Sequence, residues 1–157
     1  MAALPNNSDL IELLSSLVED RIRFLVVGGH AVAKHGEPRY TKDVDLWIDN
    51  SIKNATQVFQ TLRDFGAPIA TITPEFFTFD DHFLKLGKEP FRVDIICGME
   101  GLTFADAWKR KVCGDLFGVK TWFISIGDLI RLKTIAGRPQ DNLDVQRLRA
   151  QLRSKKT

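Results

Sequence analysis

The stretch "FLVVGGHAVAKHGEPRYTKDVDLWID", residues 24–49, joins two apolar segments through a glycine pair. The first segment ends at Gly28 and Gly29, and the second begins with Asp43 and Asp45, one residue apart. Two like charges side by side on a strand repel each other, and a strand with only a structural role gains nothing from them. The pattern therefore raises the question of which positive charge or ligand compensates Asp43 and Asp45.

On both sides of this stretch, the apolar periodicity predicts an alternation of helices and strands. Leucines at helical spacing predict a helix over residues 8–19, followed by a buried strand, "RFLVV". The glycine pair is expected to break this strand, and a short helix is expected over residues 30–35. Next in chain order, we expect a strand at "DVDLWID", a helix at "NATQVFQTLRDFG", and a hairpin of "HFLKL" and "FRVDII" across "GKEP". A short helix at "FADAWKRKV" and a strand at "KTWFIS" are expected to follow. The last two expected elements are a helix at "GDLIRLKTIAG", begun by an S-x-x-D cap at Ser125 and Asp128, and a helix over roughly residues 140–152.

This order of elements predicts an α/β (α+β) fold in which a small mixed β-sheet is flanked by helices. A length of 157 residues suits one domain, residues 1–157, with C-terminal helices from about residue 125. A content of 44% hydrophobic and 27% charged residues is typical of a soluble globular chain. No apolar run approaches the roughly 20 residues of a membrane span, and the N-terminus does not resemble a signal peptide, so a cytoplasmic protein without membrane contact is expected.

The cysteines do not indicate a metal site, and the net charge does not indicate a nucleic-acid site. Cys97 and Cys113 show no metal-binding spacing, so two reduced thiols are expected. The net charge of +2 is too small to indicate nucleic-acid binding by itself.

Three aspartates are the candidate catalytic and metal-binding residues. Side chains on a strand alternate with a period of two, so Asp43 and Asp45 point to the same side. Asp94 is a polar residue inside the apolar strand "FRVDII", and it can reach the same ion if the two strands are neighbours. Three such carboxylates suit Mg²⁺ or Mn²⁺ and are enough to hold two metals about 3.5–4 Å apart for phosphoryl or nucleotidyl transfer. The alternative is a charged pair on a surface strand, which is common.

The glycine pair has two interpretations. Glycine lets a backbone approach a phosphate closely, and a helix N-terminus offers unpaired N–H groups and a partial positive charge. Gly28 and Gly29 could therefore bind a phosphate, or they could serve only a tight turn from strand to helix.

These segments together resemble a known superfamily. "VVGGHAVAKHG", followed by "RYTKDVDLWID" and "FRVDII", is similar to the polymerase-β-type nucleotidyltransferases, and more narrowly to their small bacterial branch, which includes AbiEii-like, lincosamide-type and minimal nucleotidyltransferase proteins. The resemblance is close over residues 24–49 and looser over residues 90–97. The segment "ISIGDLIRLKTIAGRPQDNLDV" also resembles the tail of this branch.

The resemblance implies a nucleotidyltransferase-like fold and a role for each of these residues. Asp43, Asp45 and Asp94 would hold Mg²⁺, and Gly28 and Gly29 would bind the triphosphate of a nucleoside triphosphate. An acceptor would attack the α-phosphate and release pyrophosphate, with Asp94 able to act as a general base. Many members have a serine after the first glycine, whereas Gly29 leaves only backbone N–H groups for the phosphate.

Several positive charges lie near these motifs. Arg39 and Lys42 precede the D-x-D strand and are either phosphate ligands or solvated loop charges. Lys133 stands at the margin of the apolar stripe of its helix, where it either extends to solvent or points into a cleft, and the resemblance implies a phosphate-binding lysine on this helix. Asp141 is expected to cap the last helix, with pairing to Lys133 as the alternative. Trp47 shares the face of the aspartates and either packs in the core or stacks on a base.

The function implied by the resemblance is Mg²⁺-dependent transfer of a nucleoside monophosphate from a nucleoside triphosphate to an unidentified acceptor, which is a protein, an RNA or a small molecule. Because few helices follow residue 125, either a partner protein presents the acceptor or a homodimer completes the site; in this branch the partner is sometimes a toxin or antitoxin protein. The basic segment "RLRAQLRSKKT" is expected to be a solvated helix face, with RNA contact as the alternative. Two other functions stay open: an inactive binding module of the same fold, and a D-x-D phosphohydrolase.

Overall fold

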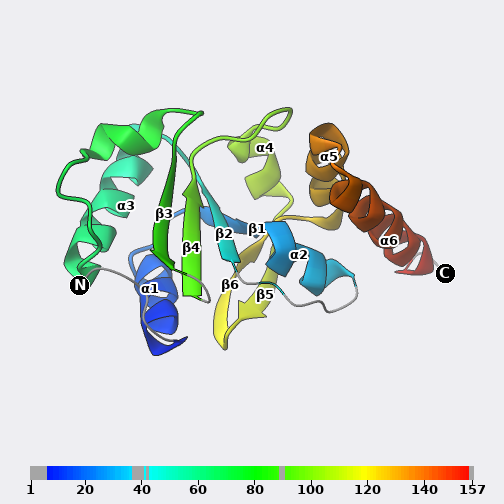
Figure 1. Ribbon diagram of the computed structural model, residues 1–157, viewed down its shortest axis with the longest axis horizontal. Coiled ribbons are helices and arrows are strands. Elements are labelled where there is room, and N and C mark those ends of the chain that lie inside the picture. The colour runs from blue at the N-terminus through cyan, green and yellow to red at the C-terminus, as the bar shows by residue number, and fades with distance from the viewer. Residues whose placement is uncertain (1–6, 37–40, 42, 89–90, 156–157) are drawn as a thin grey trace.

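A computed structural model describes residues 7–36, 41, 43–88 and 91–155 of the chain (Figure 1). Six strands form one mixed sheet in the order β3-β4-β2-β1-β6-β5. The strands are β1 (Phe24–Val27), β2 (Asp43–Ile48), β3 (Phe83–Lys88), β4 (Phe91–Ile96), β5 (Val112–Leu116) and β6 (Val119–Phe123). The helices are α1 (Asn7–Glu19), α2 (Gly28–His35), α3 (Ile52–Phe65), the 3₁₀ helix η1 (Pro74–Thr78), α4 (Phe104–Lys109), α5 (Ile126–Ala136) and α6 (Pro139–Lys155). The predicted fold class is confirmed.

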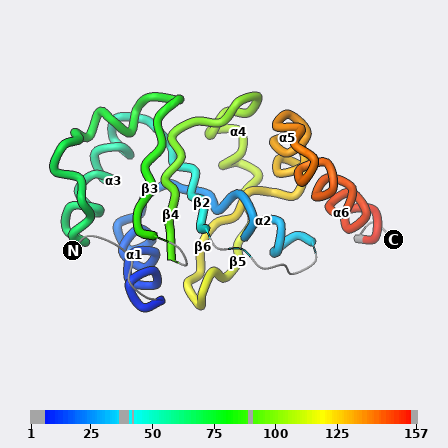
Figure 2. The backbone as a smooth tube through the Cα atoms, in the orientation of Figure 1, coloured from blue at the N-terminus to red at the C-terminus, as the bar shows by residue number. Residues whose placement is uncertain are grey.

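The sheet is mixed because hairpins and crossover connections alternate. β3 with β4 and β5 with β6 form antiparallel hairpins, and β1 pairs antiparallel with β2. The crossovers make β2 parallel to β4, and β1 parallel to β6. After the central strands β1 and β2, the chain reaches one edge of the sheet at β3 and returns inward at β4, and then reaches the other edge at β5 and returns inward at β6 (Figure 2).

Helices cover both sides of the sheet (Figure 1). On one side α1 packs against α3 and contacts β4 and β6, and on the other side α2 contacts β1, β2, α5 and α6. The leucines at helical spacing in α1 are buried, as the sequence predicts. Among the described residues, no helix combines the length and the apolar character needed to cross a membrane.

The start of α2 differs from the sequence prediction. The helix begins at Gly28 rather than at residue 30, directly after the last residue of β1. Gly28 has a φ of +67°, and a Cβ atom there would collide with the Asp45 carboxylate. Only glycine satisfies both constraints, so the chain turns from strand into helix without an intervening loop.

The strands differ from the sequence prediction at two further places, whereas the predicted cap at Ser125 is confirmed. Gly87 and Lys88, expected in the hairpin loop, belong to β3. The strand β5, which the sequence analysis does not predict, contains Gly114 and Asp115, and both residue types are rare in strands. In the predicted S-x-x-D cap, Ser125 Oγ does accept the N–H of Asp128 at 3.2 Å, whereas the Asp128 carboxylate pairs with Arg110 at 2.9 Å instead of reaching back to the helix start.

A buried asparagine joins the first two strands to α3. Asn54 is 4% exposed, and its side-chain amide donates to the carbonyls of Arg23, at 3.1 Å, and Asp49, at 2.7 Å. Its Oδ1 accepts the Arg23 N–H at 2.9 Å. These three hydrogen bonds hold the start of β1 and the end of β2 against the start of α3.

We expect Asn54→Ala to lower the free energy of unfolding by roughly 1–3 kcal/mol, because it removes three hydrogen bonds of a buried amide and takes the side-chain partner from the Arg23 N–H and the Asp49 carbonyl. Urea unfolding followed by circular dichroism measures this change. The control is Thr56→Ala, which removes one hydrogen bond to the Ile52 carbonyl within the same helix and should cost about 0.5 kcal/mol or less. Equal losses in the two variants would contradict a joining role for Asn54.

Candidate functional site

The three candidate aspartates lie together on one face of the sheet. β2 and β4 are parallel neighbours in a register that pairs Asp45 with Asp94 and Asp43 with Arg92. Because side chains alternate along a strand, all four of these side chains point to the same side. We call this side, which α2 and α5 cover, the aspartate face. The structure therefore brings Asp43, Asp45 and Asp94 together, as expected for neighbouring strands.

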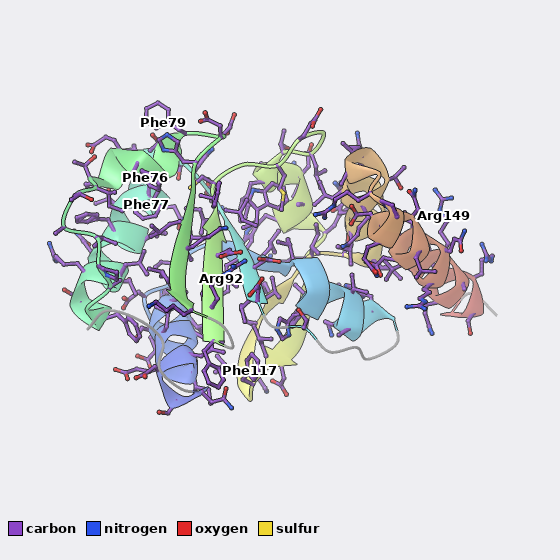
Figure 3. The ribbon with its side chains drawn as sticks, viewed as in Figure 1. Phe76, Phe77, Phe79, Arg92, Phe117 and Arg149 are labelled. Atoms are coloured by element: carbon purple, nitrogen blue, oxygen red, sulfur yellow. The ribbon has the colours of Figure 1, made fainter. Side chains whose placement is uncertain are left out.

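An arginine that the sequence analysis does not single out lies among these carboxylates. Arg92 Nη2 is 2.8 Å from Asp43 Oδ2 and 3.2 Å from Asp94 Oδ2, and its Nε is 3.2 Å from Asp94 Oδ1. The side chain is 25% exposed and lies near the centre of the molecule (Figure 3). Its guanidinium is the positive charge that compensates the crowded aspartates in the absence of a ligand.

Asp45 is the carboxyl group that this arrangement compensates least. Burial raises its pKa to about 6, with further contributions from the negative charges of Asp94 and Asp43 and from a hydrogen bond with Asp94. Arg92 acts in the opposite direction, but burial and the two neighbouring carboxylates outweigh it. An ionised Asp45 therefore costs stability in this site, so a bound cation would be favoured there.

Next to Asp45, the first turn of α2 and the helix α5 enclose a cavity of about 200 Å³. Its lining includes Gly28, Asp45, Lys133 and Arg138. Gly29 lies in the same first turn of α2, whose N–H groups have no partners earlier in the helix. We call this space the aspartate cavity; it places the glycine backbone, the two carboxylates of Asp45 and Asp141 and two cationic side chains around one small volume.

The lysine at this cavity is already paired. Lys133 Nζ is 3.1 Å from Asp141 Oδ1 and 3.2 Å from Asp144 Oδ2, and both of these carboxylates are almost fully buried. Arg138 also bonds Asp141, at 2.6 Å, and the two cations lower the pKa of Asp141 against the opposing effect of burial. Asp141 accepts the backbone N–H of Arg138 as well, at 3.3 Å, so it both pairs with Lys133 and caps the start of α6.

Neither Trp47 nor His30 is among the described residues that line the aspartate cavity. Arg39 and Lys42 lie outside the described residues. Trp47 is 1% exposed and packs edge-on against Phe104, with ring centroids 5.3 Å apart, so it is a core residue and is not free to stack on a base. His30, next to the glycine pair, has a pKa lowered by burial and packs against Phe117.

Arg92 and Arg138 are the residues that sequence reasoning missed. For Arg92 the signal was available, since it stands two residues before Asp94 and a strand places such pairs on one face. Arg138 lies three residues before Asp141 at the start of α6, a spacing that allows a local ion pair and that was also a signal in the sequence.

The carboxylates of the aspartate face are suitable ligands for a divalent cation, but their present positions do not form a metal site. Asp43 Oδ1 and Asp94 Oδ1 are buried and make no hydrogen bond, and carboxylate oxygens are the ligands that Mg²⁺ prefers. Within the described part of the chain, however, no group of three or more His, Cys, Asp or Glu side chains is placed to hold a metal ion as it stands. Since Arg92 bonds two of the three carboxylates, the residues fit a metal once this guanidinium moves away.

We expect Asp45→Asn to stabilise the protein at pH 8 in the presence of a chelator, by roughly 1–3 kcal/mol. The pKa of Asp45 is raised from 3.8 to about 6 in the folded state, so its contribution to stability is fully present below pH 3.8. This contribution is lost as the pH rises through about 6. The asparagine cannot ionise, so its advantage should disappear at pH 4. Melting temperatures across this range measure the difference, with Asp43→Asn as the control, because that variant loses the 2.8 Å pair with Arg92 and should be destabilised at pH 8. A destabilised Asp45→Asn variant at pH 8 would show that the ionised carboxylate is structural.

Comparisons with known proteins bear on the fold and the family of this chain. One solved structure with the same fold is lincosamide antibiotic adenylyltransferase LnuA with lincomycin bound, at 17% identity and a TM-score of 0.59, covering 92% of this chain and 96% of that chain. Another is TM1012 from Thermotoga maritima, a presumed nucleotidyltransferase, at 18% identity and a TM-score of 0.58, covering 87% of this chain and 88% of that chain. No curated protein sequence matches the chain. A family model described as "Nucleotidyltransferase of unknown function (DUF6036)" matches residues 6–152, so this chain belongs to the DUF6036 family of nucleotidyltransferases.

Proposed function

We propose that this protein transfers a nucleoside monophosphate from a nucleoside triphosphate to an acceptor hydroxyl, with Mg²⁺ or Mn²⁺ bound at Asp43, Asp45 and Asp94. The observation that carries the proposal is the register of β2 and β4, which sets Asp45 directly opposite Asp94 beside the start of α2. Family membership supports nucleotidyl transfer in general, and the roles of the individual residues are part of the proposal.

The carboxylates act as the metal-binding group of the site. A bound divalent cation supplies positive charge to the phosphates and lines up the attacking and leaving oxygens. Asp43 Oδ1, which is buried without a hydrogen-bond partner, is the oxygen most available to it, whereas Asp94 Oδ1 faces Arg92 Nε at 3.2 Å. A cation held by these carboxylates would take over charge compensation from Arg92, whose guanidinium could then contact a phosphate oxygen.

The triphosphate is expected in the aspartate cavity. Gly28 and Gly29 offer backbone N–H groups at the start of α2, where a helix favours negative charge. Lys133 and Arg138 line the opposite wall and exchange part of their contact with Asp141 for phosphate oxygens. Arg39 and Lys42 remain candidates for further phosphate contacts on the basis of the sequence alone.

In the transfer itself, the acceptor oxygen forms a bond to the α-phosphorus while the bond from that phosphorus to the bridging oxygen of the β-phosphate breaks. Pyrophosphate leaves with the bonding electron pair, and the hydroxyl proton passes to Asp94 or to water. Asp94 is suited to accept the proton because it lies beside Asp45 and is 13% exposed, so little water competes for it.

The two other functions can be separated from this one. An inactive module of the same fold would bind nucleotide without turnover. A phosphohydrolase would form a phosphoaspartate at Asp43, whereas Asp43 in this structure is paired with Arg92 and the family assignment points to nucleotidyl transfer. A protein partner, a homodimer and an RNA acceptor stay predictions from the sequence.

The direct test is incubation with each α-³²P-labelled nucleoside triphosphate, Mg²⁺ and a cell lysate. We expect a labelled product whose formation falls at least about 100-fold in Asp45→Asn and Asp94→Asn, because both lose a charge that acts in the transition state. Asp64→Asn, on the exposed side of α3, is the matched control and should keep full activity. Nucleotide binding without any labelled product would support the inactive module instead.

Arg92 provides a test that needs no acceptor. We expect Arg92→Gln to melt several degrees lower than the wild type in chelator, because Asp43 and Asp94 then face each other without a cation. Added Mg²⁺ should raise its melting temperature more than that of the wild type, since the metal no longer competes with a guanidinium. Arg63→Gln, which breaks an exposed pair with Asp64, is the control for loss of an arginine. An equal or smaller effect of Mg²⁺ in Arg92→Gln would argue against metal binding at these carboxylates.

A further inference from the structure

A larger cavity of about 840 Å³ lies beyond the carboxyl ends of β2 and β4. Its lining residues come from segments 47–50, 80–81 and 97–105, which follow β2, precede β3 and follow β4. In open α/β sheets, ligands bind in crevices outside the carboxyl ends of parallel strands. The volume falls in the range of about 300–1,000 Å³ typical of sites for small molecules.

This cavity adjoins the proposed site of nucleotidyl transfer. Met99 lines both the larger cavity and the aspartate cavity. Trp47, in the wall of the larger cavity, follows Asp45 by two residues on the same face of β2, a separation of about 7 Å along a strand. A molecule bound in the larger cavity can therefore present a group toward Asp45 and Asp94.

The wall of the larger cavity carries one sign of charge. Four carboxylate residues line it, and none of its described lining residues is a lysine, arginine or histidine. The four are Asp49, Asp80, Asp81 and Glu100. A cleft lined by one sign of charge attracts ligands of the opposite sign and repels those of its own. We call this space the acidic cavity.

The rest of the lining favours an organic cation over a bare ion. Phe104 contributes a half-buried aromatic ring, with the buried Trp47 packed edge-on against it, and ammonium groups are attracted to aromatic faces. Met99 and Leu102 add apolar surface. The carboxylates come from three separate segments and surround the space, which suits a molecule whose positive charge is spread over several atoms.

The walls are joined to one another in the absence of any ligand. Asn50 donates one hydrogen bond to Asp80 Oδ1, at 2.7 Å, and another to the Cys97 carbonyl, at 2.9 Å. The Cys97 N–H donates to the His82 carbonyl at 3.1 Å, and Gly98 packs so closely on the Asp80 backbone that a Cβ would collide with it. A cavity built in this way loses little conformational entropy when a ligand binds.

We propose that the acidic cavity binds the acceptor, and that the acceptor is a small organic cation carrying an amine and the hydroxyl that is modified. This inference rests on the proposed function, because it names the acceptor class for the same reaction. The cavity suits a small molecule in size, and its charge opposes the phosphates of RNA. The ammonium group pairs with the carboxylates, and the hydroxyl points past Met99 toward Asp94.

The test is a titration followed by two-dimensional NMR, which suits a chain of 17.8 kDa. The probes are 1,3-diamino-2-propanol, its neutral N,N′-diacetyl derivative, and the hydroxy-anion malate. We expect the diamine to cause saturable shifts in the amides of Gly98 and Gly101 and in the side chain of Asn50, with Gly114 and Gly118 on the β5–β6 hairpin unchanged. The diacetyl derivative should bind at least about tenfold more weakly, and malate should not bind.

Two double variants test whether the diamine binds in the acidic cavity. The double variant Asp81→Asn with Glu100→Gln alters two exposed carboxylates of the acidic cavity and should raise the Kd for the diamine at least about fivefold. The matched double variant Glu12→Gln with Asp115→Asn removes the same charge from exposed positions on α1 and β5 and should leave the Kd unchanged. Equal binding of the three probes, equal effects of the two double variants, or no shift at Gly98 and Gly101 would overturn the proposal.

These experiments distinguish a failure of the proposed acceptor class from a failure of the proposed nucleotidyl transfer. If the diamine binds in the acidic cavity but no nucleotide is ever transferred, the proposed function fails and the cation selectivity of the cavity stands. If label from the nucleotide is instead transferred to RNA or to a protein in the lysate, nucleotidyl transfer stands and the small cationic acceptor is refuted.

Discussion

The pairing of β2 with β4 is the constraint on which the rest of this structure depends. Val44, Leu46, Val93 and Ile95 are buried on the side of the sheet that α1 and α3 cover. Because a slip of one residue along a strand would turn every side chain to the other face, this apolar surface strongly specifies the register. That register sets Asp45 beside Asp94 on the opposite face, so hydrophobic packing on one side places the acidic groups on the other.

Crowded carboxylates have to be compensated, and the chain does this with its own cations. Arg92 bonds Asp43 and Asp94, and Lys133 lies between Asp141 and Asp144. Each cation is thus held in place before any ligand arrives, which reduces the cost of organising the site. The same pairs oppose the binding of metal and phosphate, since each ligand has to replace an existing contact. Stability without ligand and affinity for ligand are therefore opposed in this site.

The aspartate cavity and the acidic cavity divide one face of the sheet by charge. The aspartate cavity combines the start of α2 with the cations Lys133 and Arg138 and the carboxylates Asp45 and Asp141, and a metal cation bound at Asp45, as proposed, would let this lining attract phosphate groups. The acidic cavity contains carboxylates and aromatic rings, and it attracts cations. Met99 lies where the two cavities adjoin. Two substrates of opposite charge would each have an electrostatic reason to enter the correct compartment.

Local pattern alone determined a large part of this protein: the strand at Asp43–Ile48 and its apolar face, the helix at Asn7–Glu19, and the shared orientation of Asp43 and Asp45. These follow from periodicity over a few residues, which a sequence displays directly. Only the tertiary structure decided that β4 lies next to β2, that Arg92 reaches Asp43 across 49 positions of chain, and that Asn54 joins two strands to a helix. The physical reason is that strand neighbours and buried polar contacts are selected by packing between segments far apart in the chain, and no local periodicity encodes that choice.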